Sequence, residues 1–379
     1  MSNPAFTPQD HGHMRRALEL AIKGFGRTKP NPMVGAVIVK DGAVVGEGWH
    51  TAYGAPHAEQ EALAMAGEHA RGADLYVTLE PCNHTGHTPP CAEAILQAGV
   101  KRVVMAGLDP NPRVTGGGAA RLESSGVTVM SGLLAEEAEI LNEPFLTAMR
   151  RQRPYVVLKA AVSVDGFLAT TDNDSGQRCG GMSGPESHAR VHQLRAALDA
   201  VLVGGSTVLH DDPLLTARGL PGVRQPRKVI LDHDLMTPPG ARLFDDNDQP
   251  PLFLAGPTAS PAHIQRLEAA GAQVEILPAA PGQHFMDPAT ILSRLWDLGI
   301  TSVLVEGGGQ VHGSFMAAGL FDRMELFITP HVFGRGVPLF DGPAWRSLAQ
   351  TPDLRFESAC MLGQDVHLVA RSAETKLTR

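Results

Sequence analysis

The chain has 379 residues, a length that favours two domains over a single core. A net charge of −8 argues against a general nucleic-acid-binding surface, because such a surface needs a basic stripe. Four cysteines are too few for a disulfide framework, and the sequence has neither an apolar signal segment nor a stretch that could span a bilayer. We therefore expect a cytoplasmic protein that binds neither nucleic acid nor a membrane.

Apolar periodicity in the first 150 residues predicts alternating helices and strands. Helices are expected at residues 13–24, 58–68 and 91–98. Strands are expected at residues 34–39, 44–48, 75–79, 103–107 and 127–130. A hairpin turn is expected at Asp41 and Gly42, and a plain loop at Gly116, Gly117 and Gly118. The alternation predicts an α/β domain with a mixed sheet covered by helices.

A basic stretch at residues 150–154, which ends in Pro154, marks the expected boundary between a domain at 1–150 and a second at 151–379. In the second domain, a helix is expected at 186–198 and another after the glycines that follow Val305. Strands are expected at 155–161, 200–203, 228–231, 251–254, 273–277, 302–305 and 325–328. This domain is therefore expected to be α/β as well.

Candidate zinc ligands lie between residues 57 and 91. His57, Cys82 and Cys91 offer one imidazole and two thiolates, a set that leaves a fourth zinc position open, as catalytic sites do. A histidine followed two positions later by a glutamate, with a later Pro-Cys pair, is typical of zinc nucleobase deaminases. Glu59 is then the expected catalytic residue, because it can carry a proton to a leaving amine. The alternative is a closed structural zinc site, with His84 or His87 as fourth ligand.

Three segments of the first half, at residues 28–35, 81–91 and 107–112, resemble the bifunctional deaminase–reductases of riboflavin biosynthesis. The resemblance implies a cytidine-deaminase-like three-layer domain in which Asn31, His50 and His87 contact the pyrimidine substrate. From the residues alone, Asn31 can also be a turn residue, because Asn-Pro is a common turn, and His50 would usually be a surface or core histidine. The family often has lysine or arginine at the position of His87, and histidine is a weaker cation at neutral pH.

In the second half, residues 159–166, 199–218 and 305–309 resemble the reductase half of the same family, which is similar in fold to dihydrofolate reductase. The resemblance implies that NADPH is held by Thr207, Asp211, Gly308, Gly309, Gln310, Val311, His312, Gly313 and Ser314. It implies that the ribosyl phosphate substrate is held by Lys159, Arg195, Leu215, Arg218 and Glu306. Without the resemblance, Arg195 is equally an exposed helix residue, Lys159 a polar strand end and Asp211 a turn cap.

The resemblance therefore implies a two-step enzyme and, because the family forms dimers or tetramers, a homo-oligomer. Its first half would deaminate 2,5-diamino-6-(ribosylamino)-4(3H)-pyrimidinone 5′-phosphate, and its second would reduce the ribosyl chain to ribityl with NADPH. Gly181 stands where the family usually has tryptophan, which motivates the alternative of an active deaminase joined to a non-catalytic reductase-like domain. A zinc-stabilised regulatory or binding module is the alternative from another class, and Glu59 argues against it.

Overall fold

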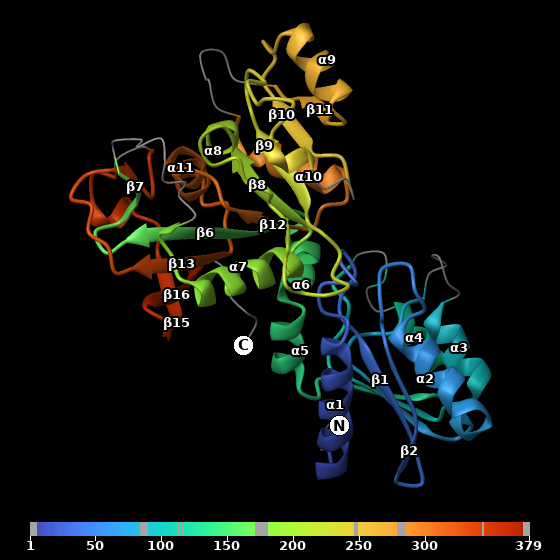
Figure 1. Cartoon of the computed structure of the whole chain (residues 1–379). Coiled ribbons are helices and arrows are strands. Elements are labelled where there is room, and N and C mark those ends of the chain that lie inside the picture. The colour runs from blue at the N-terminus through green and yellow to red at the C-terminus, as the bar shows by residue number, and fades with distance from the viewer. Residues whose placement is uncertain are drawn as a thin grey trace. The chain divides into compact units, whose positions relative to one another are not determined.

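The chain folds into two compact units, seen in a computed structural model (Figure 1). The structure describes residues 6–83, 90–111, 114, 117–170, 181–245, 249–278, 286–342 and 345–373. The first unit comprises Met1–Gln152 together with Gly222–Arg224, and the second comprises Arg153–Pro221 together with Gln225–Arg379. Within the described residues, every helix is too short or too polar to cross a membrane.

The first unit contains a five-stranded sheet with the strand order β2-β1-β3-β4-β5. Its strands are β1 (Gly35–Lys40), β2 (Ala43–Trp49), β3 (Asp74–Val77), β4 (Arg102–Met105) and β5 (Thr128–Ser131). Its helices are α1 (Pro8–Ile22), α2 (Ala58–Ala66), α3 (Cys91–Ala98), α4 (Gly117–Ser124), α5 (Ala135–Leu141) and α6 (Glu143–Arg151), with a 3-10 turn at Gly67–Ala70. Strand β1 is antiparallel to β2 and β3, whereas β3, β4 and β5 are parallel, so the predicted mixed sheet is confirmed.

Alternating side chains of β1 build a core on each face of this sheet. Ala36 and Ile38 pack with residues of α2, α3 and α4, whereas Val37 and Val39 pack with residues of α1 and α5. Because successive side chains of a strand point to opposite faces, one short apolar run supplies both cores. The result is a three-layer arrangement of helices, sheet and helices.

The hairpin between β1 and β2 has the predicted two-residue turn. Lys40 pairs with Ala43, and the residues between them, Asp41 and Gly42, have φ values of 50° and 83°. Positive φ at both positions matches the type I′ turn, whose twist suits the strands that it joins.

Two expectations in the first unit are wrong. Helix α1 begins at Pro8 rather than at residue 13, because the Thr7 side chain accepts a hydrogen bond from the Asp10 amide and caps the helix. Gly117 and Gly118 begin helix α4 and are not a plain loop. A Cβ atom on Gly118 would lie 1.8 Å from the Pro81 carbonyl oxygen, so glycine is needed there for close approach of two backbones.

The second unit contains a nine-stranded sheet with the order β11-β10-β9-β8-β12-β6-β13-β16-β15. Its strands are β6 (Tyr155–Ser163), β8 (Ala200–Gly204), β9 (Arg227–Leu231), β10 (Leu252–Ala255), β11 (Gln273–Ile276), β12 (Ser302–Val305), β13 (Arg323–Thr329), β15 (Leu354–Leu362) and β16 (Asp365–Ser372). Strands β7 (Phe167–Ala169) and β14 (Val337–Pro338) pair separately. The helices are α7 (Pro185–Ala197), α8 (Gly205–Asp211), α9 (Pro261–Ala269), α10 (Pro288–Asp297) and α11 (Gly309–Ala317), with 3-10 turns at Arg242–Phe244 and Leu348–Gln350.

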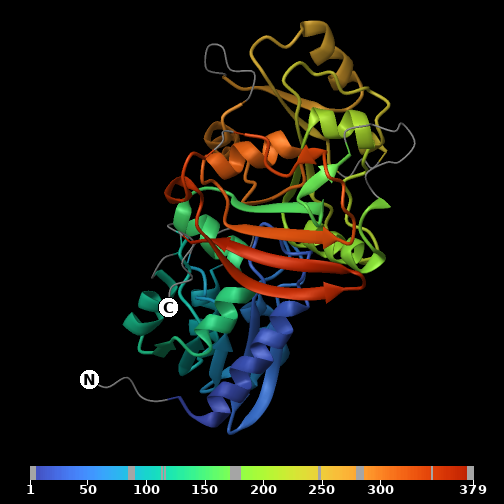
Figure 2. The same cartoon turned by 90° about the vertical axis from the view of Figure 1, so that its left-hand side faces the viewer.

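The seven strands from β11 to β13 are parallel, and β16 and β15 add an antiparallel end to the sheet. Figure 2 shows these two C-terminal strands in red, side by side. The sequence predicts the seven parallel strands but not β15 and β16. Most side chains of β15 are exposed, so its residues lack the alternation of apolar and polar positions that identifies a strand.

Candidate functional site

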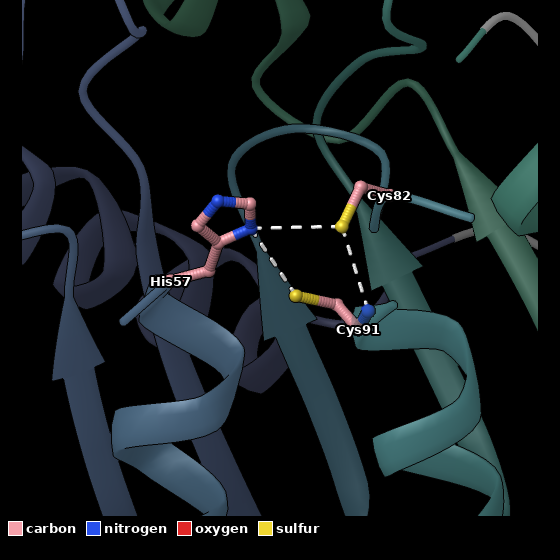
Figure 3. A group of neighbouring side chains, drawn as sticks. All are labelled: His57, Cys82 and Cys91. Atoms are coloured by element: carbon pink, nitrogen blue, oxygen red, sulfur yellow. Dashed lines mark hydrogen bonds between the residues drawn. The ribbon is translucent and has the colours of Figure 1, made fainter. Parts of the chain in front are cut away.

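The three predicted metal ligands lie together in the first unit (Figure 3). His57 directly precedes α2, Cys91 is the first residue of α3, and Cys82 lies in the segment after β3. Their ligand atoms all lie within 4.8 Å of one another. The His57 Nδ1 atom is 3.6 Å from the Cys82 sulfur and 3.3 Å from the Cys91 sulfur.

These separations suit a tetrahedral zinc ion. Bonds of about 2.0 Å to nitrogen and about 2.3 Å to sulfur place tetrahedral nitrogen and sulfur ligands about 3.5 Å apart. The Cys91 amide also donates a hydrogen bond to the Cys82 sulfur, at 3.4 Å, which favours the thiolate form of a ligand. The donor set and its spacing therefore fit zinc.

Close packing of α2 on strand β2 positions His57. A Cβ atom on Gly48 would lie 2.3 Å from the Ala58 carbonyl oxygen, at the first residue of α2. A Cβ atom on Gly46 would lie 2.3 Å from the Ala62 carbonyl oxygen, one turn further along. Two glycines on one strand thus let the helix backbone rest directly on the sheet, which leaves the start of α2 little freedom to move.

The metal site opens onto a cavity of about 250 Å³. Its walls include His57, Cys82, the predicted catalytic Glu59 and the predicted substrate residues Asn31 and His50. A closed structural site would not need such a cavity, so the geometry favours the catalytic interpretation. His84 and His87, the alternative fourth ligands, lie outside the described residues, and so does the predicted substrate contact of His87.

Glu59 is 3% exposed and lies within this cavity wall. Burial raises the pKa of Glu59 to about 7, because the charged carboxylate loses its hydration. A hydrogen bond from the Cys91 thiol holds the pKa of Cys82 below its usual range. A hydrogen bond with Cys82 raises the pKa of His57. Glu59 can therefore accept and release a proton near neutral pH.

Asn31 and His50 form a linked pair at the cavity. The Asn31 Nδ2 group lies 3.3 Å from His50 Nε2, and His50 Nδ1 lies 3.1 Å from the Pro56 carbonyl oxygen. An amide can only donate through Nδ2, so His50 accepts at Nε2 and donates from Nδ1, as a neutral imidazole. Burial also lowers the pKa of His50, which favours the same neutral form.

Several residues of this cavity carry no signal in the sequence that would single them out. Tyr53, Glu80 and Phe145 line it, although neither pattern nor spacing marks them. The buried Glu80 carboxylate accepts amide hydrogen bonds from Asp109, Gly118 and Ala119, so it joins the segment after β4 to the start of α4. Glu80 therefore holds together parts of the cavity wall that lie 29 to 39 positions further along the sequence, and periodicity cannot reveal such contacts.

A second cavity of about 700 Å³ lies within the second unit. Residues at the carboxyl ends of parallel strands contribute to it, where α/β proteins commonly bind ligands. All five predicted substrate residues line it, namely Lys159, Arg195, Leu215, Arg218 and Glu306. Leu215 is buried with a φ of 55°, a backbone conformation that costs a leucine about 1–3 kcal/mol and is typical of functional sites.

Glu306 is the centre of a charge network in this cavity. Arg195 donates to it from Nε at 2.7 Å and from Nη2 at 2.9 Å, and the Lys159 Nζ atom lies 3.7 Å away. Burial alone would raise the pKa of Glu306, but the charges of Arg195 and Lys159 lower it to about 2. Burial also lowers the pKa of Lys159. Glu306 is therefore ionised at physiological pH.

Helix α7 carries Arg195 into the cavity and is anchored at two points. The Asp365 carboxylate of β16 accepts hydrogen bonds from the Gly184 amide at 2.8 Å and the Ser187 hydroxyl at 2.6 Å, at the start of the helix. One turn further, Arg190 forms an ion pair with the fully buried Glu325. Arg195 is thus a cavity residue and not the exposed helix residue of the alternative interpretation.

The predicted cofactor residues divide into two groups. Thr207, Asp211, Gly308 and His312 line the second cavity, whereas Gly309, Gln310, Val311, Gly313 and Ser314 belong to α11 without lining it. Cβ atoms on Gly309 and Gly313 would lie 2.3 Å from the Pro338 oxygen and 2.4 Å from the Asp341 oxygen. These two glycines therefore allow α11 to pack closely on the segment at residues 338–341.

The turn-cap interpretation fits Asp212 better than Asp211. Asp212 ends α8 with a φ of 43°, and its Oδ1 atom accepts a hydrogen bond from the Arg242 amide at 2.7 Å.

A Cβ atom on Gly181, where the family usually has tryptophan, would meet no atom of the described residues within 4 Å. Met182 and Ser183, which follow Gly181, line the cavity.

Comparisons with known proteins find relatives for both units of the chain. Residues 154–368 match the family model of the RibD C-terminal domain, and residues 7–107 match that of the cytidine and deoxycytidylate deaminase zinc-binding region. The chain is 43% identical over 360 residues to the riboflavin biosynthesis protein RibD of Bacillus amyloliquefaciens, which covers 94% of this chain and 95% of that protein. It is 42% identical to RibD of Aquifex aeolicus, with coverage of 94% and 97%.

Solved structures give the same result. RibD of Acinetobacter baumannii superposes with a TM-score of 0.86 at 37% identity, covering 96% of this chain and 99% of that one. A diaminohydroxyphosphoribosylaminopyrimidine deaminase/5-amino-6-(5-phosphoribosylamino)uracil reductase of Thermotoga maritima superposes with a TM-score of 0.81 at 35% identity, with coverage of 96% and 99%. The similarity therefore extends over both units.

Loss of a cysteine ligand is expected to release the metal. Cys82→Ser and Cys91→Ser should each lower zinc content, measured by elemental analysis of the purified chain, because a neutral hydroxyl binds zinc far more weakly than a thiolate. Cys360→Ser is the matched control, since Cys360 is an exposed thiol of the second unit. Wild-type zinc content in both ligand variants would contradict the assignment, and loss of the fold together with zinc would favour a structural site.

Proposed function

Since this chain belongs to the RibD family of bifunctional deaminase–reductases of riboflavin biosynthesis, we propose which of its residues carry out the two reactions. Both halves of the family are present, and zinc and NADPH are their cofactors. The proposed first substrate is 2,5-diamino-6-(ribosylamino)-4(3H)-pyrimidinone 5′-phosphate, whose deamination product is then reduced from ribosyl to ribityl. The observation that carries this proposal is similarity over 94% of the chain, with residues for each reaction gathered around a cavity of their own.

In the deaminase half, we assign zinc binding to His57, Cys82 and Cys91, and zinc would supply an activated water to the ring carbon that bears the amine. Glu59 takes the proton released by the attacking water and returns it to the departing amine. Burial raises the pKa of Glu59 above its usual range in the metal-free site, which favours uptake of a proton by this carboxylate.

Substrate recognition in this half is assigned to Asn31 and His50, which line the cavity beside Glu59. Neutral His50 holds the Asn31 amide in place through the Nδ2–Nε2 hydrogen bond. This fixed amide presents a hydrogen-bonding group to a heterocycle that is itself rich in amino and carbonyl groups. His87 stays a predicted substrate contact.

In the reductase half, NADPH supplies the hydride, and the protein positions the two reactants. Lys159, Arg195, Leu215, Arg218 and Glu306 are assigned to the substrate side of the cavity. Thr207, Asp211, Gly308 and His312 are assigned to the cofactor side, and the remaining residues of the segment 308–314 stay predicted cofactor contacts. The intact network around Glu306 supports an active reductase despite Gly181.

We place the boundary between the two domains at residues 150 and 151, which is supported by the division of the chain into compact units near Gln152. A cytoplasmic location is supported by the need for NADPH and by Cys360, an exposed free thiol. We also propose a homo-oligomer. Strand β15 is the end strand of the nine-stranded sheet, and Phe356 and Met361 on it are 67% and 61% exposed. An exposed sheet edge with large apolar side chains is a surface that a second copy can cover.

A paired assay on the purified chain tests the proposed function: ammonia release from the diaminopyrimidine, then NADPH consumption on the deaminated product. Glu59→Gln is expected to retain zinc and the fold but to lose deamination by about 10²–10⁴-fold, because the amide cannot accept the proton. NADPH consumption should be unchanged and serves as the internal control. Near-normal ammonia release by a zinc-replete Glu59→Gln protein would exclude Glu59 as the catalytic residue.

Arg195→Met is expected to change the pH dependence of reduction. Arg195 lowers the pKa of Glu306, so its loss lets burial raise that pKa, and ionised Glu306 is then lost as the pH falls toward the new value. The acid limb of kcat/KM for reduction, measured from about pH 5 to 8, should therefore move to higher pH. Arg195→Lys retains the charge and should keep most of the wild-type profile. An unmoved limb in Arg195→Met would contradict the role of this ion pair.

Light scattering of the purified chain measures the oligomeric state. Phe356→Lys should shift the mass toward the monomer, because a charge on the apolar edge disfavours its burial. Arg355→Glu changes a neighbouring exposed charge on the same strand without removing apolar surface and is the control. A wild-type chain that is monomeric at micromolar concentration would refute the proposed oligomer.

A further inference from the structure

Helix α6 (Glu143–Arg151) lies between the two regions that match family models, which end at residue 107 and begin at residue 154. One residue of this helix, Phe145, nevertheless lines the first cavity together with the metal ligands His57 and Cys82. The assignments made above give α6 no part in deamination. The contacts of its first turn indicate what it contributes.

Asn142 occupies the position directly before α6. An asparagine at this position usually accepts a hydrogen bond from an amide of its own helix, but the Asn142 side chain makes no such bond. Its Oδ1 atom instead accepts from the Met33 amide at 2.8 Å, and its Nδ2 group donates to the Met33 carbonyl oxygen at 2.8 Å. The side chain is buried, so both bonds are shielded from water. Asn142 therefore holds Met33 rather than capping its own helix.

Met33 lies in the segment that carries Asn31, and the residues on either side of it line the cavity. The carbonyl oxygen of Val34, the next residue, accepts a hydrogen bond from the His50 amide at 2.9 Å. The His50 ring is in turn linked to the Asn31 side chain. Asn142 thus fixes the middle of the wall that bears both predicted substrate residues.

Phe145 lies three positions after Asn142, so the two side chains share one face of α6. The three residues that follow Phe145 are fully buried, whereas Phe145 is only partly buried and faces the cavity. A ring that served the core alone would be buried as its neighbours are. A flat apolar ring at the wall of a cavity is suited to a planar heterocycle, because aromatic rings attract one another in offset and edge-to-face arrangements.

We propose that α6 completes the deaminase site, with Phe145 as a specificity-determining residue that contacts the pyrimidine ring and Asn142 as a positioning residue for Asn31. The inference rests on the proposed deaminase function. It assigns recognition of the flat face of the heterocycle to α6 and recognition of its polar edge to Asn31 and His50. None of the metal ligands comes from α6, so zinc binding does not depend on this contact.

The first test measures ammonia release by Phe145→Leu and Phe145→Tyr over a range of diaminopyrimidine concentrations. Leucine keeps an apolar side chain but removes the ring, so KM should rise about 2- to 10-fold, the usual value of an aromatic contact. Turnover at saturating substrate should change little, because Glu59 and the metal ligands are untouched. Phe145→Tyr retains the ring and should keep a KM close to that of the wild type.

The second test replaces Asn142. Asn142→Leu has a similar shape but removes both hydrogen bonds to Met33, so KM for the diaminopyrimidine should rise about 10-fold. Asn142→Asp keeps an acceptor for the Met33 amide and should lose less. If Asn142→Leu does not fold, Asn142→Asp and the two Phe145 variants decide the outcome.

Phe6→Leu is the matched control, because Phe6 is a partly buried ring of the first unit that packs beside residues of α1 and does not line the cavity. Zinc content, NADPH consumption and the thermal unfolding midpoint verify that each variant is folded. An unchanged KM in Phe145→Leu, or an equal rise in Phe6→Leu, would overturn the inference, and so would a fall in kcat at unchanged KM. A wild-type chain that releases no ammonia would instead contradict the proposed function.

Discussion

Each of the two cavities described above contains a buried glutamate, Glu59 in the first and Glu306 in the second. The chemistry of each site depends on how the charge of that carboxylate is stabilised. A buried carboxylate must be paired with a cation, accept several hydrogen bonds or take up a proton. Glu306 is paired with Arg195 and Lys159 and has a pKa of about 2. Among the described residues, no arginine or lysine pairs with Glu59, and burial raises its pKa to about 7. One residue type thus serves as a permanent anion in one site and as a proton carrier in the other.

This difference explains the surroundings of each site. The first cavity needs only three ligands and a fixed helix start, which the close contact of α2 with Gly46 and Gly48 provides. The second cavity must hold several charged side chains in fixed positions. Helix α7, which carries Arg195, is therefore anchored by hydrogen bonds to Asp365 and by an ion pair with Glu325. The larger network therefore depends on strands that are remote in the sequence, whereas the metal site depends on local segments.

The same contrast decides how much the sequence could predict. The predicted zinc ligands and Glu59 lie within residues 57–91 and are of distinctive chemical types, so their spacing alone was enough to predict them. The α/β class and the positions of most strands followed from apolar runs. The pairing of Arg195 with Glu306 spans 111 positions. The sequence did not suggest this pairing, because the family resemblance implied only that both residues hold the substrate. Glu80 acts through backbone amides, which leave no pattern in the sequence. Such contacts are formed by tertiary folding, which periodicity does not encode.

The cap on α7 affects the order in which the two sites can form during synthesis. Every residue that lines the first cavity has been synthesised once the chain reaches Phe145. The start of α7, by contrast, is capped by Asp365, 181 positions after Gly184. Domains generally fold as units during synthesis, with the N-terminal one first. A nascent chain on the ribosome therefore contains all parts of its metal site long before Asp365 is available to cap the helix that carries Arg195. The two sites are thus completed at widely separated stages of translation.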